Sequence, residues 1–282
     1  MTRVHFETKP TEQSKEYAQL VDLVLVILNR ITVELTLESQ HNKSLTKDQF
    51  RVAVRLIHSA CVIGTIQPEL IRERSIRLPY AFPLARMYYE RLLSAAYILS
   101  DDGSAAKRAI LYSAYSVFKN QKKLFSVNGY RKVIKDKFPI PRKSEIVVEA
   151  LDYFKKARSI REYEHDRAAR REIVGARSIK AGMQFQVVEQ AGHSISSEVV
   201  HGSYLSTILF CDEPKIGTPE KSLDEATTMI MTISILASEA LGHLLVELFP
   251  DLPSPPLLIE AGKTFMKMEV PEAINLINRV YG

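Results

Sequence analysis

Residues 20–35 of the chain are LVDLVLVILNRITVEL, and this stretch predicts a buried α-helix. Its apolar side chains recur at steps of three and four residues, at Leu20, Val24, Ile27, Leu28, Ile31 and Leu35. That spacing places them on one face of a helix, which we expect to extend from about Thr11 to Glu38. The apolar run over residues 20–28 contains an aspartate and is far shorter than the about 20 apolar residues that span a bilayer. We therefore expect a core helix and no membrane partner.

The same helical periodicity continues along most of the chain. Thr46 and Gln49 form a capping-box pattern that predicts the start of a second helix, whose apolar stripe extends to Cys61. Pro83 suits the first turn of a third helix, with apolar residues as far as Leu99. No segment alternates with the period of two that a half-buried strand shows. The fold class that we predict is all-α, an irregular multi-helix bundle with no substantial sheet.

Caps and prolines predict the helix boundaries in the rest of the chain. The expected segments are a helix capped by Ser104, a connection over 126–143, a long charged helix from Ser144 to about 173 whose charges are solvated, and a helical stretch over 179–209. Ser222 and Glu225 form another capping-box pattern, which opens a helix to about residue 249. Four prolines end that helix, and we expect a short terminal helix from Pro271.

Length and composition favour a single domain with a large core. The chain has 282 residues, of which 46% are hydrophobic, and only 11 are glycine. A chain of this kind can bury a sizeable core without long flexible linkers. We expect one all-α domain over residues 1–282, with an N-terminal helical pair at 11–67, a central core at 68–210 and C-terminal helices at 219–282.

Cysteine usage and the first residues of the chain indicate the compartment. Cys61 and Cys211 form no C-x-x-C pair, so neither a zinc knuckle nor a redox motif is predicted. Residues 1–16 lack the apolar segment of a secretory signal peptide. We therefore expect a soluble protein in a reducing cytoplasm.

Charge is unevenly distributed along the chain, although the net charge is only +5. Residues 105–180 carry 20 basic and 8 acidic side chains, whereas residues 181–282 carry 5 basic and 13 acidic ones. This asymmetry predicts either an anionic partner for the middle segment or packing of the middle segment against the acidic one.

Three common catalytic motifs are absent from the sequence. It has no phosphate-binding loop, no zinc-binding H-E-x-x-H and no G-x-S-x-G nucleophile elbow. These absences count against a P-loop nucleotidase, a zinc protease and an α/β-hydrolase. We expect no cofactor and no metal.

Arg86 and Glu90 are the first candidate site. They lie four residues apart, on one face of a helix whose other positions are largely apolar. A charge pair in such a helix is expected to be partly buried, and buried charges require partners. Two interpretations remain open: a structural ion pair between helices, or an arginine that holds a phosphate and is oriented by the glutamate.

His193, Ser197 and His201 are the second candidate site. Their spacing of four residues places them along one face of a helix, and Gly202 follows directly. Two helical turns separate the histidines by about 12 Å, so that one metal ion cannot easily bridge them. His201 suits a general acid or base that Ser197 orients. A hydrogen-bonded polar seam in the core is the alternative.

The third candidate is a basic segment over residues 119–143. It holds nine basic residues and a single acidic one, with three aromatic residues interleaved. The nucleic-acid-binding candidates within it are Lys119, Lys122, Lys123, Arg131, Lys132 and Lys135. Basic and aromatic residues together suit RNA or another polyanion, through phosphate contacts and stacking. They equally suit a solvated surface loop.

Two of these motifs together resemble a family of bacterial helical proteins, the DUF5677 type. The resemblance consists of Arg86-x-x-x-Glu90 in a tyrosine-rich helix, and of Ser197-x-x-x-His201 followed by a small residue. It covers about residues 70–210, which is half of the chain. The resemblance implies a helical fold, and the family name implies no activity.

A looser likeness is to the HEPN superfamily of small helical domains, which are often dimeric and are found in phage-defence and toxin systems. Many of them are metal-independent ribonucleases in which four to six residues lie between an arginine and a histidine. The close pair in this chain, Arg161 and His165, has three residues between its members, one fewer than that pattern. The likeness therefore implies a ribonuclease only if Arg86 and His201 meet in space.

Two functions follow from these patterns. The first is a partner-binding or regulatory helical module of a bacterial stress or phage-defence locus, with a protein partner. The alternative is a metal-independent ribonuclease in which His201 is the general acid or base, Arg86 stabilises phosphate charge, Glu90 orients Arg86 and Ser197 bonds the histidine. Under both we expect a homodimer through the apolar helices at 12–38 and 222–249.

Overall fold

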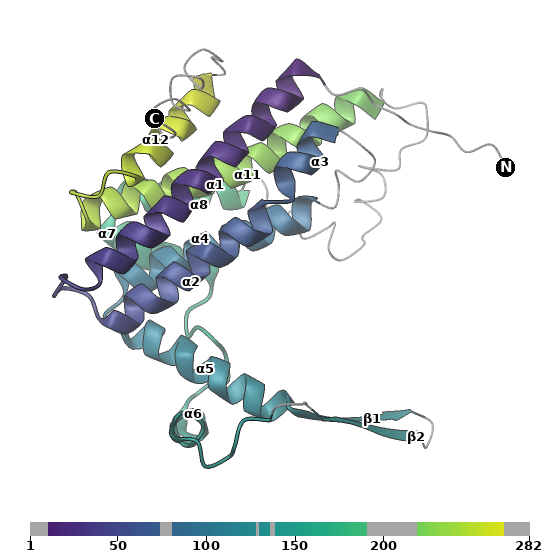
Figure 1. Ribbon diagram of the computed structural model, residues 1–282, viewed down its shortest axis with the longest axis vertical. Helices are drawn as coiled ribbons and strands as arrows, with labels where there is room; N and C mark the ends of the chain where they lie inside the picture. Colours follow the sequence, from purple (N-terminus) through teal and green to yellow (C-terminus); the bar gives the residue numbers. More distant parts are fainter. Residues whose placement is uncertain (1–10, 74–80, 128–129, 136–138, 191–218, 268–282) are drawn as a thin grey trace.

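The structure is a computed structural model that describes residues 11–73, 81–127, 130–135, 139–190 and 219–267. In this part of the chain, helices form a bundle from which a smaller arm projects (Figure 1). The bundle consists of α1 (Glu12–Glu38), α2 (Lys47–Gly64), α3 (Gln67–Glu73), α4 (Ala81–Ser100), α7 (Arg167–Arg177), α8 (Ile179–Val188), α11 (Pro219–Leu248) and α12 (Pro255–Lys267). The arm consists of α5 (Ser104–Asn120), β1 (Lys122–Val127), β2 (Tyr130–Lys135) and α6 (Glu145–Lys156). The predicted all-α class is confirmed, and the two strands form a single small hairpin.

Helix α4 is the centre of the bundle. It packs against α2, α11, α7 and α3, and every residue from Leu92 to Ser100 is buried. A helix that is buried on all sides needs apolar or small residues around its whole circumference, and this segment supplies them. Each fully buried leucine or isoleucine contributes about 1.5–3 kcal/mol to folding.

Helix α1 covers one side of this centre with the stripe that the sequence predicted. All six residues of that stripe are buried in the core, and α1 contacts α2, α3, α11 and α12. The apolar faces of α1 and α11 are thus used within one chain. The homodimer stays a prediction, but these two faces no longer support it.

A chain of buried hydroxyl groups fixes the positions of α3, α4 and α11 relative to one another. Ser238 donates to the carbonyl oxygen of Ser234 at 2.7 Å, so its single proton is committed. The Tyr88 hydroxyl, 2.6 Å from Ser238 Oγ, must therefore be the donor in that contact. Ser234 in turn donates to Gln67 Oε1. Burial raises the pKa of Tyr88 far above its ordinary range, so that it remains a donor.

The predicted capping box of α2 is confirmed. Thr46 Oγ1 accepts from the backbone of Gln49 at 3.2 Å, and Gln49 Oε1 accepts from the backbone of Thr46 at 2.9 Å. The Gln49 amide also donates to the carbonyl oxygens of Ile98 and Asp101. This cap therefore also ties α2 to the end of α4. Thr11 caps α1 in the same reciprocal way with Ser14.

The predicted Ser104 cap is wrong. Gly103, at a φ of 100°, is the N-cap of α5 and offers no side chain. The Asp101 carboxylate takes the capping role, because it accepts from the backbone of Ala105 at 2.8 Å and from the Ser104 hydroxyl at 3.1 Å. A carboxylate is the stronger acceptor at a helix N-terminus.

The predicted long helix from Ser144 to residue 173 is also wrong. Helix α6 ends at Lys156, residues 157–166 form a non-helical connection, and α7 begins at Arg167. Asp166 caps α7 by accepting from the backbone of Ala169 at 2.9 Å. Ser144 precedes α6 but makes no side-chain capping bond. The charged segment containing Arg161 and His165 therefore lies in the connection and not on a helix face.

Two further boundaries differ from the prediction. Helix α11 begins at Pro219, so Ser222 and Glu225 lie inside the helix and do not form its N-terminal capping box. Pro255 and Pro256 occupy the first turn of α12, a position that tolerates the missing N–H, whereas we had expected prolines only to end a helix. The predicted stretch over 179–209 is α-helical as far as Val188. Its part beyond residue 190 and the helix expected from Pro271 lie outside the described residues.

One helix in the described ranges, Ala226–Leu248, is long and apolar enough to cross a membrane by length and composition alone. Its apolar window is 78% buried inside the bundle. Such burial is typical of the core helix of a soluble protein.

Helices α7 and α8 cross at two glycines. A Cβ atom on Gly182 would lie 2.6 Å from the Cα of Gly175, closer than real atoms approach. A Cβ atom on Gly175 would meet its nearest neighbour, the Cα of Gly182, at an ordinary 3.7 Å. The close approach therefore depends on Gly182 alone.

We expect Gly182→Ala to lower the free energy of unfolding by about 1–3 kcal/mol, because the backbones of α7 and α8 must move apart. Gly175→Ala is the matched control and should raise stability by up to about 1 kcal/mol through helix propensity. Urea denaturation of both variants measures these effects. Equal effects of the two substitutions would contradict this packing.

Candidate functional site

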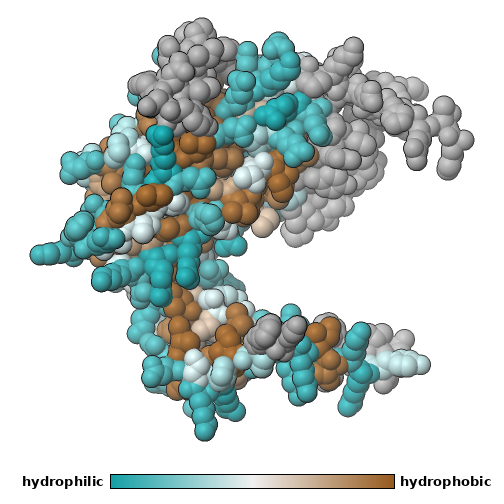
Figure 2. Space-filling view, viewed as in Figure 1, coloured by the Kyte–Doolittle hydropathy of each residue, from teal (hydrophilic) through white to brown (hydrophobic). Residues whose placement is uncertain are grey.

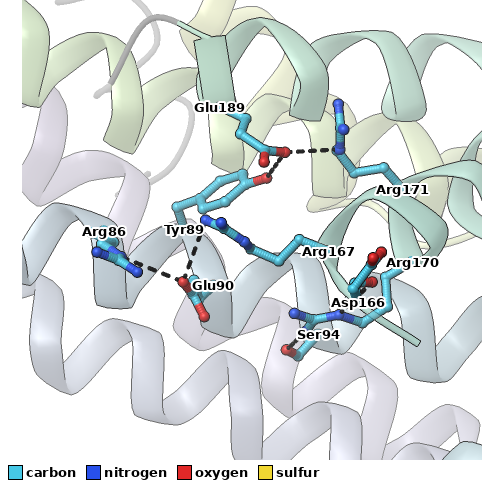
Figure 3. Close-up of polar contacts among 9 residues, drawn as sticks. All are labelled: Arg86, Tyr89, Glu90, Ser94, Asp166, Arg167, Arg170, Arg171 and Glu189. Carbon is cyan, nitrogen blue, oxygen red and sulfur yellow. Dashed lines mark hydrogen bonds and ion pairs between the residues drawn. The ribbon is translucent and has the colours of Figure 1, made fainter. Parts of the chain in front are cut away.

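The Arg86–Glu90 pair lies on the surface between α4 and α7. Arg86 Nε is 3.5 Å from Glu90 Oε1, and the two side chains are 24% and 36% exposed. The same carboxylate oxygen lies 3.8 Å from Arg167 Nη1, on α7 (Figure 3). Glu90 therefore links two helices, as the structural interpretation of this pair expects. The catalytic role of Arg86 and Glu90 stays a prediction.

Arg171 and Glu189 form a second ion pair beside the first. Arg171 Nε is 2.8 Å from Glu189 Oε2, to which the Tyr89 hydroxyl donates at 3.4 Å (Figure 3). Burial, together with the neighbouring carboxylate of Glu189, raises the pKa of Tyr89 well above its ordinary value. Tyr89 is therefore a donor that holds the end of α8 on α4.

Arg170 is the most deeply buried of these arginines. Its Nη1 donates to Ser94 Oγ at 2.8 Å, and its Nε donates to the carbonyl oxygen of Asp166 at 3.4 Å. Its guanidinium also lies 5.0 Å from the ring centre of Tyr163. These contacts anchor α7 and the connection before it against α4.

The sequence contained an overlooked signal for this cluster. Arg167, Arg170 and Arg171 follow one another at steps of three and one, a spacing that gathers them on one side of a helix. We had assigned that segment to solvated charge. In the structure these three arginines and Arg86 contact two carboxylates, one serine and one tyrosine ring. The cluster is therefore mainly a network that joins α4, α7 and α8.

A shallow groove of about 310 Å³ lies beside this network, between α7 and α8. Its polar lining residues are Arg171, Glu172 and Gln186. Ile179 and Met183 supply apolar surface. Within the residues that the structure describes, no three histidine, cysteine, aspartate or glutamate side chains are placed to hold a metal ion.

His193, Ser197 and His201 lie outside the described residues. The structure therefore places one half of the predicted ribonuclease site, Arg86 with Glu90, and gives no position for the other half. The assignment of Ser197 and His201 stays a prediction.

The basic segment forms the β-hairpin at the end of the arm, where we had expected an irregular connection over 126–143. Strands β1 and β2 pair antiparallel, with Lys122 opposite Lys135 and Val127 opposite Tyr130. The neglected sequence signal is Asn128-Gly129 between residues of high strand propensity, which is typical of a two-residue hairpin turn. The hairpin stands clear of the bundle (Figure 2).

All six predicted nucleic-acid-binding residues are exposed and belong to this hairpin or its base. Five are on the strands: Lys122, Lys123, Arg131, Lys132 and Lys135. Lys119 lies in the last turn of α5, with its amine 5.6 Å from the ring centre of Tyr115. Among the described residues, none of the six has a carboxylate within ion-pair distance, and neither strand contains an acidic residue. Within the described part of the chain, the five positive charges of the hairpin are therefore not compensated by a carboxylate.

The hairpin depends on the α5–α6 pair for its position. Leu111, Ala150 and Phe154 form a small core of their own, separate from that of the bundle. The rings of Tyr112, Tyr115 and Tyr153 pack around Phe154. Lys107 and Glu149 add an ion pair at 3.0 Å between the two helices. This core makes α5 a rigid base for the strands.

The chain matches no protein-family model, no curated protein and no solved structure. The likeness to the DUF5677 type and to the HEPN superfamily therefore stays a prediction from the motifs.

We expect Arg170→Ala to destabilise the fold by about 2–3 kcal/mol, because it removes the buried hydrogen bond to Ser94 Oγ and the contact with the Tyr163 ring. Arg86→Ala should cost less than about 1 kcal/mol, since the pair with Glu90 is partly exposed. Chemical denaturation of the two variants measures the difference. An Arg86 variant that loses more stability than the Arg170 variant would show that Arg86 has a further buried partner.

Proposed function

We propose that this protein is a non-enzymatic helical binding module that contacts nucleic acid through the β-hairpin of its arm. The observation that carries the proposal is the uncompensated charge of the hairpin. Five of the twelve strand residues are lysine or arginine, none is acidic, and the described ones are exposed. The proposal includes a role in a bacterial stress or phage-defence locus, and this part rests on the resemblance alone.

The hairpin is poorly explained by the needs of folding. Two-stranded hairpins without further packing are marginally stable in water. Lys122 and Lys135 lie directly opposite each other, and like charges in such a pair are destabilising. The arrangement thus weakens the hairpin but concentrates positive charge. Such an arrangement is expected where a bound polyanion offsets the repulsion between the cations.

Lysines on an exposed strand edge also disfavour pairing with another sheet. This argues against a protein strand as the partner of the hairpin. Phosphates suit it better, because each lysine that contacts a phosphate releases a condensed counterion from the nucleic acid. Tyr130, which is 84% exposed, adds an aromatic ring to the same surface.

The metal-independent ribonuclease is the alternative proposal. The 3.5 Å contact between Arg86 and Glu90 suits an arginine oriented toward a phosphate. An RNA-cleavage assay in excess EDTA, with Arg86→Ala and His201→Ala as variants, tests it. Cleavage by the wild type alone, with all three proteins folded, would replace the binding module with an enzyme.

The test of nucleic-acid binding uses Lys122→Gln/Lys135→Gln. This double substitution removes a repulsive pair, so it should preserve or improve the hairpin while weakening binding. We expect the magnitude of the slope of log K against log salt for labelled nucleic acid to fall by about 1.4–1.8, since each of the two lost phosphate contacts contributes about 0.7–0.9.

Lys180→Gln/Lys263→Gln is the matched control, because both lysines are exposed on the bundle and the change in net charge is the same. The control should keep the affinity and salt slope of the wild type in fluorescence anisotropy. Equal losses in both double variants would show non-specific attraction by net charge and would contradict the proposal.

A further inference from the structure

We propose that the hairpin enters the major groove of double-helical B-form DNA and does not lie along a single strand. This inference rests on the proposed function and narrows it to one class of nucleic acid. It follows from the distribution of charge over the two faces of the hairpin, from its dimensions and from its exposure.

The register of the hairpin places cations on both of its faces. Residues directly opposite each other in an antiparallel pair share a face, and successive residues alternate between faces. Lys122 and Lys135 are opposite each other, and Arg131 lies on their face because it is four residues from Lys135. Lys123 and Lys132 lie on the other face. Three cations thus point to one side and two to the other.

Two charged faces discriminate between kinds of nucleic acid. A single strand follows one basic face and stacks its bases on aromatic residues of that face. It would leave the cations of the opposite face without phosphates. A groove has a phosphate backbone along each wall, so a ribbon inside it meets phosphates on both sides. The described cations of β1 and β2 suit the second arrangement.

The dimensions of the hairpin select the groove. Sheets that pack face to face lie about 10 Å apart, which corresponds to a thickness of about 10 Å for one sheet with side chains on both faces. The major groove of B-form DNA is about 12 Å wide and about 8.5 Å deep and admits a two-stranded ribbon. The minor groove, about 6 Å wide, does not accommodate lysines on both faces. The major groove of A-form RNA is too deep and narrow for side chains to read.

The six-residue strands are long enough for this contact. At about 3.4 Å per residue they extend about 20 Å, which corresponds to about six base pairs along the helix axis. All of β2 is exposed, as are Lys122 and Lys123 at the start of β1. In the space-filling view the hairpin projects from the molecule with open space on the side facing the bundle (Figure 2).

The experiment is fluorescence anisotropy with a 20-base-pair DNA duplex, an RNA duplex of the same sequence and the DNA single strand. We expect the DNA duplex to bind most tightly and with the steepest salt dependence. Two double variants each remove one pair of cations from one face: Lys122→Gln/Arg131→Gln and Lys123→Gln/Lys132→Gln. Each should lower the salt slope for the DNA duplex by about 1.8, twice the contribution of one contact. Filling the minor groove with distamycin should leave the affinity unchanged.

Each of the opposite results has a distinct meaning. Tighter binding of the single strand, with the loss confined to one face, would overturn the groove contact but keep the proposed function. Displacement by distamycin would likewise overturn the major-groove assignment. Failure of the wild type to bind any of the three probes would overturn the proposed function itself. The Lys180→Gln/Lys263→Gln control identifies effects of net charge in the measurement with each of the three probes.

Discussion

The buried guanidinium of Arg108 is the contact on which the position of the arm depends. Arg108 is only 5% exposed, and among the described residues it has no carboxylate partner. Its Nη2 donates to the carbonyl oxygen of Ser159 at 2.8 Å, and its Nε to that of Arg161 at 3.1 Å. The rings of Phe154 and Tyr153 lie on the same guanidinium. Because a guanidinium remains charged when buried, these contacts are needed to compensate it. One side chain thereby holds α5, α6 and the connection to α7 together.

This contact divides the molecule into two parts with different tasks. The bundle around α4 uses its charges internally, since Glu90 and Glu189 are each shared with arginines of α7. The arm does not pair the charges of its hairpin in this way. Its small aromatic core lies between α5 and α6, and the hairpin charges face solvent. Paired charges hold helices in place at modest net benefit, whereas unpaired charges of one sign attract an anionic partner. The arginine cluster therefore serves the fold, and the lysines of the hairpin serve the proposed function.

Local patterns predicted the fold class and the helices whose signals are self-contained, such as the apolar stripe of α1 and the Thr46–Gln49 cap. These patterns gave wrong boundaries where a contact between residues far apart in the sequence determines the local structure. The break between α6 and α7 depends on Arg108, about 50 residues away, which takes backbone carbonyls that a continuous helix would use. The prediction of the hairpin failed for another reason. Asn128-Gly129 signals a turn, but the flanking sequences KKLFSV and YRKVIK lack the regular apolar–polar alternation of a half-buried strand. The six basic residues were identifiable from composition, whereas their division between two faces required the register.

Hydrogen–deuterium exchange of the full chain, with and without a DNA duplex, tests the central claim most directly. Because every residue of β2 is exposed, the hairpin should exchange its amide protons rapidly when the protein is free. We predict that duplex DNA slows exchange at residues 119–135 and leaves the amides of α4 unchanged. Protection that appears on α7 and α8, with exchange in the hairpin unaltered, would contradict the account and assign binding to the arginine cluster instead.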